Sequence, residues 1–393
     1  MSQSLDTPRQ WLALSGCYFF FFALLGLIVP YFSTYLAQLN FSSSEIGELL
    51  AILMATRIVV PLLSASYIDK TEQRLSAVRW AAALSIVFFC GFYYATSYWE
   101  IALVLVLYAS CWSAMLPQME VITLTTLANR SHDYSKVRLW GSIGFIVLVV
   151  SGGFIFESFG IDWIISLGVL VLLGLLFTTK FINYWTPQHH GKTESNTSFY
   201  ARLKERNMVL FLFSVLLLQI SHGPYYSFFV LYLLDYGYTE SFSGIQVALG
   251  VCAEVVVFTV TATLLRRIGA KRLLFVSMLF SVLRWWLMPL VVENATLLSL
   301  SQLLHAASFG SAHAAAMAML HYWFKGNSQG RGQAVYASIS FGVGGVLGAL
   351  FSGYAWQQGS GATLTWIIAG LIALLASVLV SLIQYPQQRD NTT

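Results

Sequence analysis

Charge is the property that this sequence lacks most. Asp, Glu, Lys and Arg together make up only 10% of the 393 residues, whereas ordinary globular proteins carry about 25%. A soluble fold of this length needs far more charge to cover its surface, so the soluble class is excluded. Hydrophobic residues, at 57% of the chain, form long apolar runs. These runs also exclude disordered, collagen-like and nucleic-acid-binding proteins.

The sequence has only four cysteines and lacks the motifs of common enzyme classes. The four cysteines lie inside apolar runs, with neither metal-ligand nor disulfide spacing, and are expected to be small buried side chains: Cys17, Cys90, Cys111 and Cys252. The sequence has no nucleophile motif, no metal cluster and no G-x-x-x-x-G-K-[ST] loop. It therefore predicts neither an enzyme nor an ATP-driven pump, and no cofactor or metal.

Long apolar runs are abundant, and a membrane helix needs about 20 such residues. The candidate spans lie at about 10–39, 44–68, 74–95, 99–128, 135–156, 162–183, 207–236, 241–265, 272–292, 295–324, 331–356 and 362–384. The first is too long for a signal-peptide core and lacks a cleavage site, so we expect it to be retained. The sequence thus predicts an all-α integral membrane protein with twelve transmembrane helices.

The basic residues predict which way the spans face. With the N-terminus in the cytoplasm, 19 of the 21 Lys and Arg residues fall on the cytoplasmic side and none falls in an outside loop. Both termini are therefore expected in the cytoplasm. The polar stretch 184–206 is then a cytoplasmic linker between two six-helix bundles, at 1–183 and 207–393.

The turn after the second predicted span resembles a loop of the major facilitator superfamily, G-x-x-x-D-[RK]-x-G-[RK]-[RK]. Asp69, Lys70 and Arg74 match this pattern, whereas Ala65 and Glu72 replace its two glycines. The resemblance implies that Asp69, Lys70 and Arg74 help to close a cytoplasmic gate.

Other segments indicate which group of the superfamily the chain resembles. Residues 134–142, YSKVRLWGS, resemble the FGRAR-x-FG segment of lactose permease and, more closely, the YGKVRLWGS of bacterial phenylpropionate permeases. Glu120 precedes Arg138 by 18 residues, the separation of the sugar-binding pair in lactose permease. The tenth span, with His305 and His313 eight residues apart, is similar to the phenylpropionate permease pattern. Ser308 stands where lactose permease has its proton-carrying glutamate.

The chain is therefore identified as a member of the phenylpropionate permease group, 3-phenylpropionic acid transporters related to the oligosaccharide:proton symporters. This resemblance implies two bundles around a central cavity, alternating access and a location in a bacterial inner membrane. It also implies a monomer whose partners are the lipid bilayer and a small substrate, an aromatic acid or a sugar.

Five charges of the predicted spans are candidates for positions within the membrane: Arg57, Glu120, Arg138, Glu254 and Arg284. A charge near the bilayer centre costs at least roughly 2.5–3.5 kcal/mol, so it normally faces a cavity and has a partner. Arg57 and Glu254 each lie 12 residues before a charged cytoplasmic turn. At 1.5 Å per residue this is about 18 Å, near the midplane, where transporter sites lie.

Substrate contacts are expected from these charges and from neighbouring aromatic residues. Glu120 and Arg138 can meet between adjacent antiparallel helices, either as a substrate clamp or as an ion pair that anchors the loop. Three arginines against two glutamates leave a spare positive charge, which suits a small carboxylate and makes Arg57 and Arg284 substrate-binding candidates. Tyr225 and Tyr226 provide aromatic faces for an aromatic acid; the alternative is that they only pack.

Proton coupling is expected from Glu254 and His305. An apolar span disfavours the charged form of a carboxyl group, so Glu254 can exchange protons unless an arginine keeps it ionised. Histidine titrates in the physiological range, and His305 either couples protons or only packs. The sequence therefore predicts a proton-coupled symporter, with the proton as its coupling ion, that imports a small aromatic carboxylate such as 3-phenylpropionate. The alternative is a proton-coupled oligosaccharide or nucleoside permease.

Overall fold

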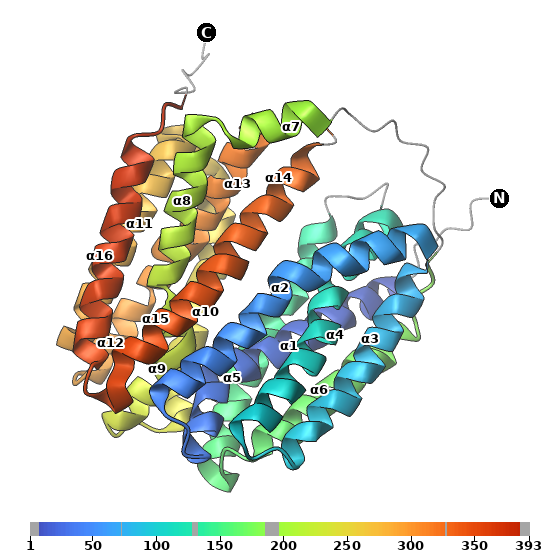
Figure 1. The fold of residues 1–393 in the computed structure, drawn as a ribbon, viewed down its shortest axis with the longest axis vertical. Coiled ribbons are helices and arrows are strands. Elements are labelled where there is room, and N and C mark those ends of the chain that lie inside the picture. Colours follow the sequence, from blue (N-terminus) through green and yellow to red (C-terminus); the bar gives the residue numbers. More distant parts are fainter. Residues whose placement is uncertain (1–7, 72, 128–132, 185–195, 327, 386–393) are drawn as a thin grey trace. The chain divides into compact units, whose positions relative to one another are not determined.

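The structure, a computed structural model, describes residues 8–71, 73–127, 133–184, 196–326 and 328–385. The helices of the first half are α1 (Pro8–Gln38), α2 (Ser43–Thr71), α3 (Arg74–Phe89) with the 3₁₀ turn η1 (Cys90–Tyr93), α4 (Tyr98–Thr126), α5 (Tyr134–Phe159) and α6 (Trp163–Thr179) (Figure 1). A short helix, α7 (Asn196–Leu203), lies in the predicted linker, whose residues 185–195 are outside the described ranges.

The second half has more helical elements because several spans are interrupted. They are α8 (Arg206–Ser221), α9 (Gly223–Asp235), α10 (Glu240–Ile268), α11 (Ala270–Val291), α12 (Ala295–Gln302), η3 (Ala306–Gly310), α13 (Ser311–Trp323), α14 (Ser328–Ala337), η4 (Ser338–Gly344), α15 (Gly345–Trp356), η5 (Gln357–Gly359) and α16 (Ala362–Ser381). Both η3 and η4 are π-helical turns.

The elements of the described ranges group into twelve spans, so the predicted all-α fold is confirmed. Ten helical segments are long and apolar enough to cross a membrane, and α6 is a shorter apolar helix of 17 residues. The charged segment α2, of 29 residues, completes the set. Span 7 breaks at His222, just before Pro224, because proline cannot donate the backbone hydrogen bond that would continue α8.

Small residues allow the helices to approach closely. A Cβ at Gly144 would collide with the backbone carbonyl of Phe19, so α5 packs directly on α1. A Cβ at Gly348 would lie 3.2 Å from the Cα of Gly223, which brings α15 against the start of α9. Since glycine has no side chain to separate the backbones, these contacts are van der Waals packing of the kind that joins helices in lipid.

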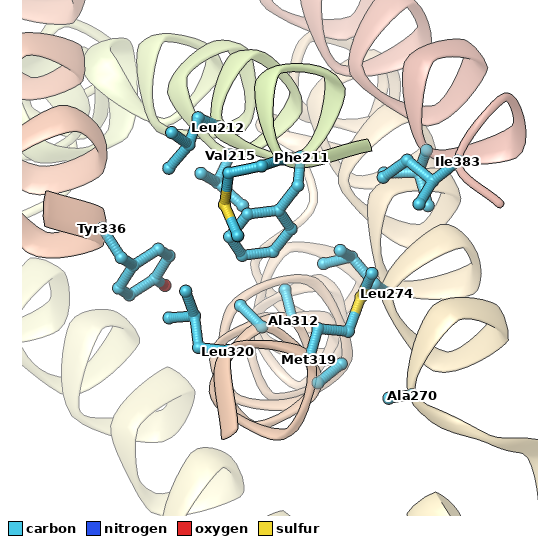
Figure 2. Packing of buried hydrophobic residues seen from close by; sticks show 14 of the residues in the cluster. Phe211, Leu212, Val215, Ala270, Leu274, Ala312, Met319, Leu320, Tyr336 and Ile383 are labelled. Carbon is cyan, nitrogen blue, oxygen red and sulfur yellow. The ribbon is translucent and has the colours of Figure 1, made fainter. Parts of the chain in front are cut away.

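Contacts between residues divide the chain into two compact units, Met1–His190 with Ser227–Ala248, and Gly191–Tyr226 with Leu249–Thr393. In the first unit, the Tyr31 hydroxyl donates to the carbonyls of Val149 (2.7 Å) and Glu240 (3.2 Å), which ties α1 and α5 to the start of α10. In the second unit, Phe211, Leu274, Met319 and other buried residues form an apolar core between α8, α11 and α13 (Figure 2). The predicted bundle boundaries remain a prediction.

Candidate functional site

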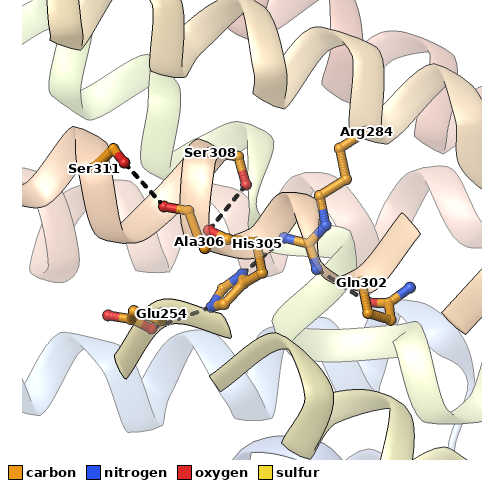
Figure 3. A network of polar contacts seen from close by, with 7 residues as sticks. All are labelled: Glu254, Arg284, Gln302, His305, Ala306, Ser308 and Ser311. Carbon is orange, nitrogen blue, oxygen red and sulfur yellow. Dashed lines mark hydrogen bonds and ion pairs between the residues drawn. The ribbon is translucent and has the colours of Figure 1, made fainter. Parts of the chain in front are cut away.

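A chain of polar side chains crosses three spans of the second unit (Figure 3). Arg284 on α11 places Nη1 2.8 Å from His305 Nδ1 and donates through Nη2 to Gln302 Oε1 at 3.2 Å. The opposite ring nitrogen of His305, Nε2, lies 3.5 Å from Glu254 Oε2 on α10. The predicted proton-coupling residues Glu254 and His305 are therefore neighbours, and the predicted substrate-binding residue Arg284 lies on the other side of the imidazole.

The arginine determines the protonation of the histidine. A guanidinium has donors and no acceptor, so Nδ1 of His305 must accept and carries no hydrogen. The hydrogen of the neutral ring is then on Nε2, the nitrogen that faces Glu254. A second proton on the ring would remove the acceptor from Arg284. His305 is thus suited to be a neutral bridge, and Glu254 to be the group that gains and loses the proton.

Accessibility supports the same assignment. The His305 side chain is 5% exposed, and that of Glu254 is 16% exposed. The carboxyl group is therefore the more accessible member of the pair. Since a proton carrier must exchange with water, Glu254 is the better placed of the two.

Arg284 is held entirely by neutral groups. It is fully buried, and its guanidinium lies over the rings of Tyr225 (4.1 Å to the centroid) and Trp285 (4.7 Å). Gln302 is itself fixed, because its amide nitrogen donates to Leu298 O (3.3 Å) and Ser301 Oγ (3.1 Å). The predicted ligand Tyr225 therefore stabilises a cation of the protein.

The imidazole of His305 lies between aromatic rings. Phe309 stacks on it with centroids 5.3 Å apart and ring planes 6° apart, and Tyr225 lies 5.6 Å away on a tilted plane. Tyr226 contacts Phe309 edge-on at 6.2 Å. Because these rings restrict rotation of the imidazole, Nδ1 and Nε2 stay directed at Arg284 and Glu254.

Two glycines allow α10 to approach His305, and the sequence analysis missed both. A Cβ at Gly310 would lie 2.8 Å from Glu254 Cγ, and one at Gly250 would lie 3.2 Å from His305 Cβ. Each functional side chain thus packs over a glycine of the opposite helix. His305 and Gly310 are five residues apart and share a face because η3 is a π turn, which has more residues per turn than an α-helix and so brings positions i and i+5 together.

The π turn also uses the serine that stands where lactose permease has a glutamate. Ser308 Oγ donates to the carbonyl of His305 (3.4 Å), and Ser311 Oγ donates to that of Ala306 (3.2 Å). These hydroxyls add side-chain hydrogen bonds to carbonyls in and beside the π turn, where the Ala306 carbonyl also accepts from the backbone N–H of Ser311. Ser308 therefore supports the turn, while the carboxylate of the network comes from α10.

In the first unit, the predicted pair of Glu120 and Arg138 is a looser contact. The two charges interact electrostatically, and Tyr134 lies beside both. Between these two described residues there is no ion pair within 4.0 Å. The Arg138 guanidinium instead lies 4.0 Å from the ring centroid of Phe22 and 5.6 Å from that of Tyr18.

Arg57 on α2 has a different environment. Its guanidinium lies 5.1 Å from the ring centroid of Trp112, and that ring stacks on Phe21 at 4.6 Å with an interplanar angle of 3°. Beside it, Thr56 and Ser113 share a hydrogen bond of 3.0 Å that joins α2 to α4. Within the described residues, Nε and Nη2 of Arg57 are buried and have no hydrogen-bond partner.

The predicted gate is described only in part. Arg74 Nη1 donates to Gln118 Oε1 at 2.7 Å, which joins the start of α3 to α4. The side chains of Asp69 and Lys70 lie outside the described residues. Their gating role stays a prediction.

Comparison with solved structures shows which fold the chain has. A crystal structure of the nucleoside transporter NupG superposes with a TM-score of 0.82 at 18% identity, covering 96% of this chain and 100% of that one. A crystal structure of an auto-inhibited POT family peptide transporter gives a TM-score of 0.75 at 12% identity, over 98% and 99% of the two chains. The chain shares the fold of these two solved structures.

Sequence comparison then identifies the family. The chain is 30% identical to the "Probable 3-phenylpropionic acid transporter" of Escherichia coli (strain K12) over 371 residues, 94% of this chain and 96% of the relative. It is 24% identical to the maltose permease of Geobacillus stearothermophilus over 374 residues, 93% of each chain. The sequence profile of the MFS_1 like family matches residues 11–368, and the chain belongs to this family of transporters. The predicted resemblance is confirmed, and the protein is a transporter rather than an enzyme.

Proposed function

We propose that the protein is a proton-coupled symporter of a bacterial inner membrane, with both termini in the cytoplasm, that imports a small aromatic carboxylate by alternating access. The observation that carries the proposal is the Arg284–His305–Glu254 chain, in which a neutral imidazole separates a cation from a carboxyl group. The name of the Escherichia coli relative supports 3-phenylpropionate as the substrate to test first.

The charge of the network suggests how proton and substrate are coupled. With Glu254 ionised, the positive charge of Arg284 is balanced through His305, and with Glu254 protonated the cluster carries a net positive charge. A more positive site binds an anion more tightly, and by linkage a bound anion favours the protonated carboxyl. Proton and carboxylate are therefore taken up together.

The other predicted residues are the proposed contacts of the substrate. Arg57, Arg138 and Arg284 are the candidate ligands of the carboxylate, and Glu120 steers the polar end of the substrate beside Arg138. Tyr225 and Tyr226 belong to the aromatic group around His305. The coupling ion is a proton, so no metal or organic cofactor is required.

The experiment uses purified protein in proteoliposomes that contain a pH-sensitive dye. We add 3-phenylpropionate outside, without an imposed gradient, and compare internal acidification with that of protein-free liposomes, because the protonated acid also crosses lipid unaided. The proposal predicts a protein-dependent signal that Glu254→Gln abolishes and that lactose does not produce. A signal of equal size from Glu254→Gln, or none from the wild type, contradicts it.

A second function, proton-coupled transport of a nucleoside or oligosaccharide, is favoured by the first-unit contact of Glu120 and Arg138. Arg138 can donate to, and Glu120 can accept from, the hydroxyl groups of a neutral solute. The structural likeness to NupG and the 24% identity to a maltose permease agree with this alternative. Competition decides between the two: uptake of labelled 3-phenylpropionate is inhibited by other aromatic acids if the first is right, and by uridine or maltose if the second is.

A further inference from the structure

The three intramembrane arginines differ in what balances their charge. Arg138 lies within electrostatic reach of Glu120. Arg284 is connected through His305 to Glu254. Arg57 lacks such a partner in its own unit: among the residues that the structure describes there, it has no ion pair, and its Nε and Nη2 have no hydrogen-bond partner.

An unbalanced guanidinium is costly in the interior of a membrane protein, because burial removes water from a charged group with several donors. The aromatic ring of Trp112 replaces part of that hydration through a cation–π contact. It offers no acceptor to the N–H groups in the guanidinium plane. The environment of Arg57 therefore lacks a negatively charged hydrogen-bond acceptor, which an anion would supply.

The other two arginines are less suited to hold an anion. Arg284 is fully buried, and the aromatic rings of Tyr225 and Trp285 lie against it. Its Nη1 faces His305 and its Nη2 faces Gln302, so only its Nε lacks a hydrogen-bond partner among the described residues. A substrate would have to displace these partners and interrupt the proton network. Arg138 already has the electrostatic influence of Glu120, which would repel an anion. Arg57 as a whole residue is half-buried and Arg284 is fully buried, although Nε and Nη2 of Arg57 are themselves buried.

We propose that Arg57 is the residue that binds the carboxylate of the transported acid. This inference rests on the proposed function and specifies its ligand as a monocarboxylate. Trp112, fixed by its stacking on Phe21, holds the plane of the guanidinium. The two carboxylate oxygens accept from the planar donors, in the paired geometry that arginine forms with carboxylates and lysine does not. In this arrangement the protein supplies the cation and the substrate supplies the missing anion.

The proposal predicts opposite effects on stability and on binding. Removing a buried charge that has a structural partner destabilises the fold. Removing a buried charge that has no counter-charge instead stabilises the fold, because the free-energy cost of burying that charge is lost. Arg57→Leu is therefore expected to melt at a higher temperature than the wild type in detergent without ligand. Addition of 3-phenylpropionate should raise the melting temperature of the wild type and leave that of Arg57→Leu unchanged.

Calorimetric binding to the purified full-length protein gives the second measurement. For 3-phenylpropionate, we expect Kd to rise at least about 100-fold in Arg57→Gln, because charge-assisted hydrogen bonds are lost. Arg57→Lys should bind more weakly than the wild type and more tightly than Arg57→Gln, because it keeps the charge and loses the paired geometry. The control is Arg9→Gln: Arg9 also lies over an aromatic ring, Phe181 at 5.0 Å, but is exposed at the start of α1. It should bind like the wild type.

Failure of the role proposed for Arg57 can be distinguished from failure of the proposed function. If the wild type binds the acid and Arg57→Gln binds it equally well, the role of Arg57 is overturned while the proposed function stands. If the wild type binds uridine or maltose and not the acid, both are overturned. A lower melting temperature for ligand-free Arg57→Leu also overturns the proposal, because it would show that the fold itself uses this charge.

Discussion

Arg284 Nη1 lies 2.8 Å from His305 Nδ1, and this contact determines which nitrogen of the imidazole carries the hydrogen toward Glu254. Arginine can only donate, so the hydrogen of the neutral ring is on Nε2, 3.5 Å from the Glu254 carboxylate. The neutral His305 ring therefore orients the proton-exchanging carboxyl group of Glu254 and lies between that group and the buried cation of Arg284.

Glu254→Gln is expected to separate exchange from net transport. The amide resembles a permanently protonated carboxyl group, so the variant can still bind substrate and reorient with it. Exchange of labelled for unlabelled 3-phenylpropionate across the membrane should persist, whereas uptake driven by a pH gradient should be lost. Loss of both activities would show that Glu254 has a role in binding or folding, and retention of both would exclude it as the proton carrier.

His305→Phe is expected to uncouple transport and destabilise the protein. The new ring keeps the stacking on Phe309 and removes both nitrogen contacts, so Nη1 of Arg284 loses its acceptor in a buried site. An unsatisfied buried donor costs about 1–3 kcal/mol. The melting temperature should fall, and substrate uptake should no longer carry protons. Normal coupling in this variant would show that the imidazole only packs.

Gln302→Leu tests whether Arg284 needs its second partner. The substitution preserves much of the side-chain volume and removes the acceptor of Nη2, which lies 3.2 Å away in the wild type. We expect a loss of stability of about 1–3 kcal/mol and a shifted pH profile of uptake, because Arg284 becomes free to turn away from His305. An unchanged pH profile combined with lower stability would make Gln302 purely structural.

Gly310→Ala is expected to weaken coupling because the new methyl group would lie 2.8 Å from Glu254 Cγ and push the carboxylate away from His305. Gly250→Ala, with 3.2 Å to His305 Cβ, should have a smaller effect of the same kind. Proton-driven uptake is the measurement. The matched control is Gly330→Ala on α14, where a Cβ meets nothing within 4 Å. If Gly310→Ala transports as well as this control, the close approach of α10 is not required.

The spans could be predicted from sequence because hydropathy and length decide them locally: the second is predicted at 44–68 and found at Ser43–Thr71. The same reasoning identified Glu254, His305 and Arg284 as intramembrane polar residues. It could not show that they touch. Glu254 reaches His305 because it packs over Gly310, and Gly310 lies on the same face as His305 only because of the π turn, which the sequence does not predict. The 18-residue spacing of Glu120 and Arg138 likewise predicts proximity, and the preference of Arg138 for the ring of Phe22 depends on packing that no spacing shows.

The account also predicts which gradient drives uptake. One proton on Glu254 and one substrate carboxylate carry no net charge together, so their joint movement should be insensitive to membrane potential. In proteoliposomes, a pH gradient that is acid outside should accumulate 3-phenylpropionate beyond the level in protein-free vesicles. A potential alone, set by potassium and valinomycin, should not.

The most direct test of the central claim is therefore accumulation of labelled 3-phenylpropionate under each gradient separately, in wild type and Glu254→Gln. The account predicts protein-dependent accumulation with the pH gradient only, and none above the lipid background in Glu254→Gln. Accumulation driven by the membrane potential alone, or equal accumulation by the two proteins, would contradict coupled movement of a proton and a carboxylate through Glu254.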